Sequence, residues 1–142
     1  IINKLEKLEP NSDEILIQKA TLLSKTGNHN KAIEYLLKAL ELTEDKIDVW
    51  TLLGMEYLYI DNFENARINF TKCVDEDYED YAALYNVIYC FDFLEQHTEA
   101  IDYLNMFLNN NPYTYFPILI LGNEKINSHI ILSIVRFITE WS

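Results

Sequence analysis

The chain has 142 residues, of which 49% are hydrophobic, and its formal net charge is −12. This length and apolar content support one domain with a buried core and exclude a disordered polar chain. The acidic balance excludes a nucleic-acid surface, which needs clustered Lys and Arg, and no apolar run approaches the roughly 20 residues of a membrane-spanning helix.

Apolar residues at helical spacing predict a series of helix pairs, and three Gly and three Pro are too few for a β-rich fold. Ser12 or Asp13 can cap the first helix, which ends at Gly27-Asn28. The predicted pairs are 13–46 (second helix from about Asn30), 47–80 (helices 47–60 and 64–76) and 81–114 (helices 81–94 and 98–110).

The two ends of the chain depart from this pattern. Pro10 lies three periods of 34 residues before Pro112, so we expect residues 1–12 to end an upstream repeat of a longer array. Residues 115–142 read as a divergent helix pair. The helix predicted over 128–141 is apolar on most of its circumference, so it either tucks into the fold or packs against another chain as a homodimer interface.

A fixed period of 34 residues relates the pairs to one another. Such a period means that one supersecondary unit is used several times. The equivalent positions are Ala20, Gly54, Ile88 and Gly122; Ala32, Ala66 and Ala100; and Leu36, Phe70 and Leu104.

The middle copy resembles the tetratricopeptide repeat family, whose pattern has a large apolar residue, Leu-Gly, Tyr, Ala and an aromatic residue at fixed offsets. The matching residues are Trp50, Leu53, Gly54, Tyr57, Ala66 and Phe70. The resemblance implies an all-α, right-handed solenoid of antiparallel helix hairpins, with about three full repeats and partial repeats at each end. It also implies a non-catalytic scaffold that binds a peptide or partner protein.

Small residues mark where the two helices of a pair cross, because larger side chains would push the helices apart. Gly54 and Ala66 are expected to make this close crossing in the second pair. Ile88 replaces the small residue in the third pair, so we expect its helices to lie further apart.

In this family the first helix of each pair lines a concave groove. The candidate partner-binding residues are Ile17, Thr21, Asp48, Thr51, Met55, Tyr59, Tyr85, Tyr89, Asp92 and Phe93. Tyr85, Tyr89 and Phe93 are spaced by four residues and form one stripe, separate from the core positions. We favour a binding role for this stripe, because aromatic rings are frequent hot spots. The alternative is that the stripe is buried against neighbouring helices.

An acidic, aromatic groove favours an apolar or basic peptide as partner. One subgroup of the family grips peptide carboxylates with Lys and Asn on these helices. The matching positions here are Ile17, Thr21, Leu52, Ala82 and Asn86, none of them basic, so the chain does not resemble that subgroup. Self-assembly through the apolar last helix is the alternative function.

Nothing in the sequence predicts catalysis, a metal or a cofactor. The run Asp75, Asp77, Glu79 lacks the Gly and the final Glu of a calcium loop. Cys73 and Cys90 have no metal or redox spacing, and packed, reduced thiols are expected, which is compatible with the cytoplasm. His29, Phe63 and His97 hold equivalent places. This equivalence indicates ring packing at the turn, as a hydrophobic staple.

Overall fold

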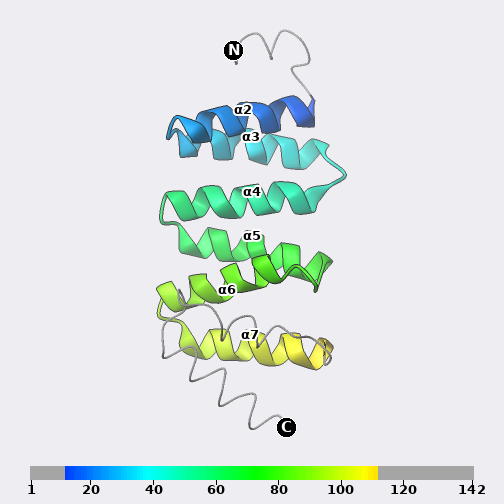
Figure 1. The fold of residues 1–142 in the computed structure, drawn as a ribbon, viewed down its shortest axis with the longest axis vertical. Helices are drawn as coiled ribbons and strands as arrows, with labels where there is room; N and C mark the ends of the chain where they lie inside the picture. Colours follow the sequence, from blue (N-terminus) through cyan, green and yellow to red (C-terminus); the bar gives the residue numbers. More distant parts are fainter. Residues whose placement is uncertain (1–11, 112–142) are drawn as a thin grey trace.

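The computed structural model describes residues 12–111, and these form a stack of α-helices without any strand (Figure 1). The predicted all-α solenoid of helix hairpins is confirmed. The predictions for residues 1–11 and 112–142, including the apolar helix over 128–141, lie outside the described residues. The helices are α2 (Asp13–Lys25), α3 (His29–Leu42), α4 (Lys46–Tyr59), α5 (Phe63–Glu76), α6 (Tyr81–Phe93) and α7 (His97–Asn110).

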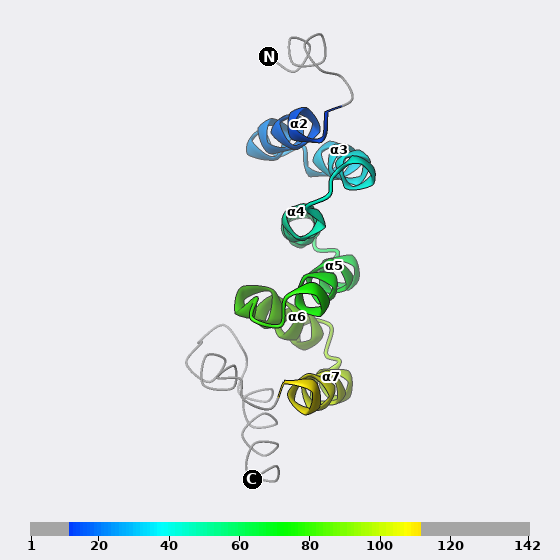
Figure 2. The same cartoon turned by 90° about the vertical axis from the view of Figure 1, so that its right-hand side faces the viewer.

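The helices alternate between two faces of the stack. Seen end-on in Figure 2, α2, α4 and α6 lie on one side, and α3, α5 and α7 lie on the other. We call the first set the A helices, which form the A face, and the second set the B helices, which form the B face. Each A helix pairs with the B helix that follows it, and each B helix packs on the next A helix.

The turn inside each hairpin is built in the same way three times. One residue per turn adopts the left-handed conformation: Gly27 at φ 83°, Asp61 at φ 59° and Glu95 at φ 57°. The next residue donates its backbone N–H to a carbonyl five residues earlier, as in a Schellman motif. These bonds run from Asn28 to Leu23 (2.8 Å), Asn62 to Tyr57 (2.9 Å) and Gln96 to Phe91 (2.9 Å).

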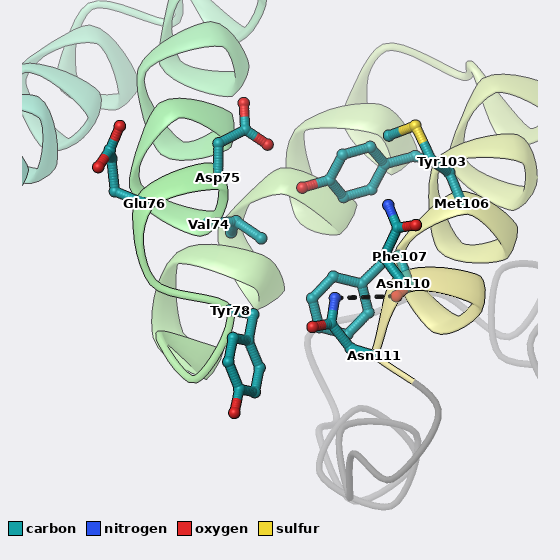
Figure 3. Close-up of a pocket in the computed structure, with 9 residues that line it drawn as sticks. All are labelled: Val74, Asp75, Glu76, Tyr78, Tyr103, Met106, Phe107, Asn110 and Asn111. Atoms are coloured by element: carbon teal, nitrogen blue, oxygen red, sulfur yellow. Dashed lines mark hydrogen bonds between the residues drawn. The ribbon is translucent and has the colours of Figure 1, made fainter.

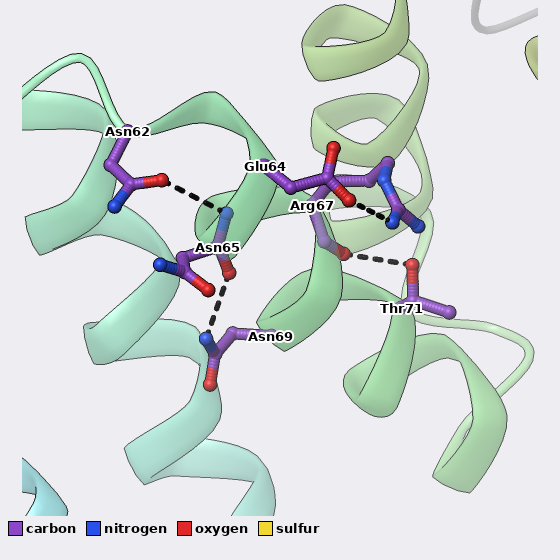
Figure 4. Close-up of polar contacts among 6 residues, drawn as sticks. All are labelled: Asn62, Glu64, Asn65, Arg67, Asn69 and Thr71. Carbon is purple, nitrogen blue, oxygen red and sulfur yellow. Dashed lines mark hydrogen bonds and ion pairs between the residues drawn. The ribbon is translucent and has the colours of Figure 1, made fainter.

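The B helices begin at His29, Phe63 and His97, one residue earlier than predicted for each pair. The residue before each one already supplies a backbone carbonyl to the first helical hydrogen bond. Asn62 also caps α5 with its side chain, because its Oδ1 accepts the N–H of Asn65 at 3.2 Å (Figure 4).

The caps of the A helices differ from one another. Ser12 was predicted as a possible side-chain cap, but its hydroxyl makes no capping bond. Its backbone carbonyl accepts the N–H of Leu16 instead. Asp80 does cap α6, since its Oδ1 accepts the N–H of Ala83 at 3.0 Å. This carboxylate also lies at the positive end of the α6 dipole.

Several polar side chains of α5 bond to groups of the same helix (Figure 4). Arg67 pairs with Glu64 at 2.6 Å, and Asn69 donates its Nδ2–H to the Asn65 carbonyl at 2.8 Å. Thr71 donates its hydroxyl to the Arg67 carbonyl at 2.8 Å. The apolar side of α5 is buried in the core. Its residues there are Phe63, Ala66, Phe70, Cys73 and Val74.

The helix crossings depend on one residue from each helix of a pair. In the second pair the ring of Phe70 lies over Gly54, so the direct partner of Gly54 is this ring rather than Ala66. The third pair has the larger combination of Ile88 and Leu104, both fully buried. The backbones of α6 and α7 approach each other less closely than those of α4 and α5, which confirms the wider spacing predicted from Ile88.

None of these helices, within residues 12–111, has the length and apolar character needed to cross a membrane.

Candidate partner-binding face

The candidate residues predicted from the sequence are all exposed or half-buried, and none belongs to the buried core. They lie on the three A helices, which occupy one side of the stack (Figure 2). Their positions are Ile17 and Thr21 on α2; Asp48, Thr51, Met55 and Tyr59 on α4; and Tyr85, Tyr89, Asp92 and Phe93 on α6.

Three aromatic rings on α6 form one row along the helix. The rings of Tyr85 and Tyr89 have centroids 6.3 Å apart, and those of Tyr89 and Phe93 are 6.2 Å apart. Exposure is greatest at the C-terminal end, where Phe93 keeps 58% of its surface in solvent, while the two tyrosines are half-buried. We call these three residues the α6 stripe.

The inner side of the α6 stripe rests on α5. Phe63, the first residue of α5, stacks on Phe93 with centroids 3.9 Å apart and ring planes 19° apart. Its ring also lies 6.4 Å from that of Tyr89. The stripe is thus partly covered by a neighbouring helix, as the alternative interpretation held, but its outer side remains open to solvent.

The Tyr85 hydroxyl distinguishes this tyrosine from the others on the face. The oxygen is buried and makes no hydrogen bond within the described part of the chain. Burial raises the pKa of Tyr85, and the nearby Tyr89 and Asp92 add to this effect. The phenol therefore stays protonated at neutral pH and has an unused donor.

The stacking of Phe63 on Phe93 is one of two equivalent contacts between repeats. One period earlier, His29 at the start of α3 stacks on Tyr59 at the end of α4, with centroids 4.6 Å apart and planes 15° apart. The predicted ring packing is confirmed for His29 and Phe63. Both rings stack on a ring of the next repeat, a contact that the staple interpretation did not predict.

His29 also makes a polar contact that sequence reasoning missed. Its Nδ1 lies 2.7 Å from Glu56 Oε2, and Glu56 is only 7% exposed. In the next repeat Phe63 and Cys90 replace this pair, and both are buried in one core cluster. The sequence does contain a signal for this contact. Glu56 is a charged residue at a position that Leu22 and Cys90 hold in the other repeats.

On α4 the face has exposed apolar side chains and a threonine hydroxyl that bonds to the helix backbone. Met55 is 38% exposed and Tyr59 is 59% exposed. Thr51 donates its hydroxyl to the Ile47 carbonyl at 2.9 Å, with Cys73 Sγ 3.4 Å away. Thr21 on α2 likewise bonds its own helix. The threonines therefore leave no hydroxyl donor for a partner, whereas Asp48 presents an exposed carboxylate.

Both cysteines are buried and free, as predicted. Burial raises the pKa of Cys73, and it raises that of Cys90 from 9.0 to about 12. Both therefore remain unreactive thiols at neutral pH. Among residues 12–111 no cluster of His, Cys, Asp or Glu could hold a metal ion. The Asp77 carboxylate instead accepts the N–H of Glu79 at 3.0 Å.

Comparison with known families and relatives agrees with this architecture. A family model described as a tetratricopeptide repeat matches residues 13–46 and 47–80. A UDP-N-acetylglucosamine--peptide N-acetylglucosaminyltransferase of Giardia intestinalis is 28% identical over 86 residues, which are 61% of this chain. The match spans only 6% of that enzyme's length, so the enzyme's activity is not carried over.

Solved structures titled MamA share the fold. The structure titled "MamA 41-end from Desulfovibrio magneticus RS-1" has a TM-score of 0.67 at 18% identity, covering 98% of this chain and 80% of that one. A second, "Crystal structure of MamA", has a TM-score of 0.65 at 19% identity, covering 99% of this chain and 86% of that one. At this identity the likeness concerns the fold alone.

Proposed function

We propose that this chain, whose residues 13–46 and 47–80 match a tetratricopeptide repeat model, is a non-catalytic scaffold that binds a partner protein or peptide on its A face. The observation that supports this most is the α6 stripe, together with the exposed side chains of Met55 and Tyr59 on α4. Rigid rings provide a large contact area at low entropic cost, which is why they dominate many interfaces.

The chemistry of the face favours an extended apolar or basic peptide. Asp48 and Asp92 are the acidic residues among the candidates, and no Lys or Arg occurs between residues 73 and 124. Complementary charge speeds association and fixes the register of the peptide.

A peptide-display selection against the chain tests the proposal, with binding of the selected peptides measured by calorimetry. The test variant is Met55→Ser with Phe93→Ser, which removes exposed apolar tips from the A face. The control is Leu37→Ser with Leu42→Ser, whose side chains are 45% and 51% exposed on α3 of the B face.

We expect peptides rich in apolar and basic residues that bind the control variant like the wild type and bind the test variant at least about tenfold more weakly. Circular dichroism should be the same for all three proteins. Equal binding by the test variant and the wild type would refute the A face as the binding surface.

Self-assembly is the second candidate, favoured by the apolar sequence of residues 128–141. Light scattering over a wide concentration range separates the two. A monomer at every concentration refutes self-assembly, whereas a dimer that is unaffected by the Met55→Ser and Phe93→Ser changes favours it.

A further inference from the structure

A second surface feature lies on the B face, between the C-terminal end of α5 and helix α7 (Figure 3). It is an open cavity of about 250 Å³. Val74 and Phe107, each 4% exposed, are its most buried lining residues. All of its lining residues lie on α5, on α7 or just after these two B helices, so it belongs to the B face.

Soft and aromatic side chains surround the cavity. Tyr78 and Met106 line it and keep 51% and 53% of their surface exposed. Tyr103 points from α7 toward the end of α5 and Asp75 (Figure 3). The Tyr78 ring and the Met106 thioether are therefore exposed beside a hollow that also has the half-buried Tyr103 in its lining.

The cavity is electrostatically negative. Asp75 and Glu76 line it from the last turn of α5, and no Lys, Arg or His is among its lining residues. Helices α5 and α7 both end here, at Glu76 and Asn110, so the negative ends of two helix dipoles add to the two carboxylates.

The neighbouring Arg67 does not neutralise this charge. Its guanidinium pairs with Glu64 at 2.6 Å and lies 5.0 Å above the Phe91 ring. Burial raises the pKa of Tyr103, with Asp75 adding to the rise and Arg67 opposing it. The Tyr103 phenol is therefore neutral, and the exposed ring of the lining that can stack on a cation is that of Tyr78.

We propose that this cavity binds one arginine side chain of a partner polypeptide. A guanidinium stacks on tyrosine faces and pairs with carboxylates at the same time, which matches rings and acids placed around one hollow. The cavity is smaller than the roughly 300–1,000 Å³ of typical small-molecule sites, so it suits a single side chain. The site lies opposite the A face, so it goes beyond the proposed function and does not depend on it.

A nuclear magnetic resonance titration of the ¹⁵N-labelled chain tests this site. The probe is the peptide acetyl-Ala-Ala-Arg-Ala-Ala-amide at millimolar concentration, and the control peptide carries citrulline, which has nearly the same shape without the charge. We expect shifts of the backbone amides of Tyr78, Tyr103 and Asn110 with the arginine peptide and not with the citrulline peptide.

The test variant and its control each neutralise two exposed acidic residues. Asp75→Asn with Glu76→Gln should weaken binding of the arginine peptide about fivefold. Glu41→Gln with Glu44→Gln removes the same charge one repeat earlier, where Glu41 is the equivalent of Asp75, and should leave binding unchanged. Tyr78→Ala, at an exposed ring, should also weaken binding.

Three outcomes overturn the proposal. They are equal responses to the arginine and citrulline peptides, wild-type affinity in the Asp75→Asn and Glu76→Gln variant, and no shift at the cavity amides. Shifts confined to Met55 and Tyr85 would assign the peptide to the A face and would likewise overturn a B-face site.

Discussion

The ring of Phe70 lies directly against Gly54: a Cβ atom placed on Gly54 would sit 2.6 Å from Phe70 Cζ. The equivalent pairs are Ala20 with Leu36 and Ile88 with Leu104. Each helix crossing therefore has a different combination of side-chain sizes. The absence of a side chain at Gly54 is what lets an aromatic ring reach the axis of the neighbouring helix.

We therefore predict that Gly54→Ala destabilises the fold and that Phe70→Leu rescues it. The clash in a packed core costs about 1–3 kcal/mol, which exceeds the gain of about 1 kcal/mol in helix propensity. The double variant recreates the pairing of Ala20 with Leu36. Urea unfolding of the two single variants and the double variant measures the coupling, and strictly additive effects would contradict it.

The left-handed turn residues give a second prediction. Glu95 at φ 57° holds a conformation that costs an L-residue about 1–2 kcal/mol, and Gly adopts it freely. Glu95→Gly should raise the free energy of unfolding by about 1 kcal/mol. Gly27→Ala, at the equivalent turn, should lower it by a similar amount. A loss of stability in Glu95→Gly would show that the side chain matters more than the turn.

The contact of His29 with Glu56 gives a third prediction. His29→Phe leaves the buried Glu56 carboxylate without this partner, and we expect a loss of about 1–3 kcal/mol. Adding Glu56→Cys reproduces the Phe63 and Cys90 pair of the next repeat and should recover most of the loss. Thermal unfolding at pH 7 measures both variants, and a double variant no more stable than His29→Phe would refute the equivalence of the two junctions.

The buried thiol of Cys90 makes stability dependent on alkaline pH. Its pKa rises from 9.0 to about 12 on folding. Between these values the unfolded chain loses the thiol proton while the folded chain keeps it. The free energy of unfolding should therefore fall as pH rises from 9 to 12, by up to about 1.4 kcal/mol per pH unit from this group.

Urea unfolding at pH 8 and pH 10.5 checks this expectation, with Cys90→Ala as the comparison. The alanine variant should lose less stability between the two pH values than the wild type. At pH 8 both thiols of the folded wild type should also resist a thiol-specific reagent that labels them rapidly in denaturant. Rapid labelling of the folded protein would contradict the burial of Cys73 and Cys90.

Much of this architecture could be predicted because its causes are local. Helical periodicity and the 34-residue period gave the described helices to within a residue or two at their ends. The wide third pair followed from the single residue Ile88. The left-handed turns at Asp61 and Glu95 were harder to predict, since neither residue type demands that conformation and only their equivalence to Gly27 indicates it.

Contacts between repeats were not predictable from composition. The stacking partner of His29 is Tyr59, which is 30 residues away in the sequence. This offset depends on how one hairpin docks on the next. For the same reason, contact of the inner side of the α6 stripe with Phe63 could not be predicted from residue types alone. The cavity beside Tyr103 also required the structure, because it arises from the spacing of α5 and α7 and not from any motif.

The stacking of Phe63 on Phe93 has a mechanical consequence. Phe93 has one side against α5 of its own array and the other side open on the A face. A ligand that covers the open side would clamp the junction between the second and third repeats as well. Ligand binding on the A face and the rigidity of the solenoid are then coupled through the Phe93 ring, and each stabilises the other.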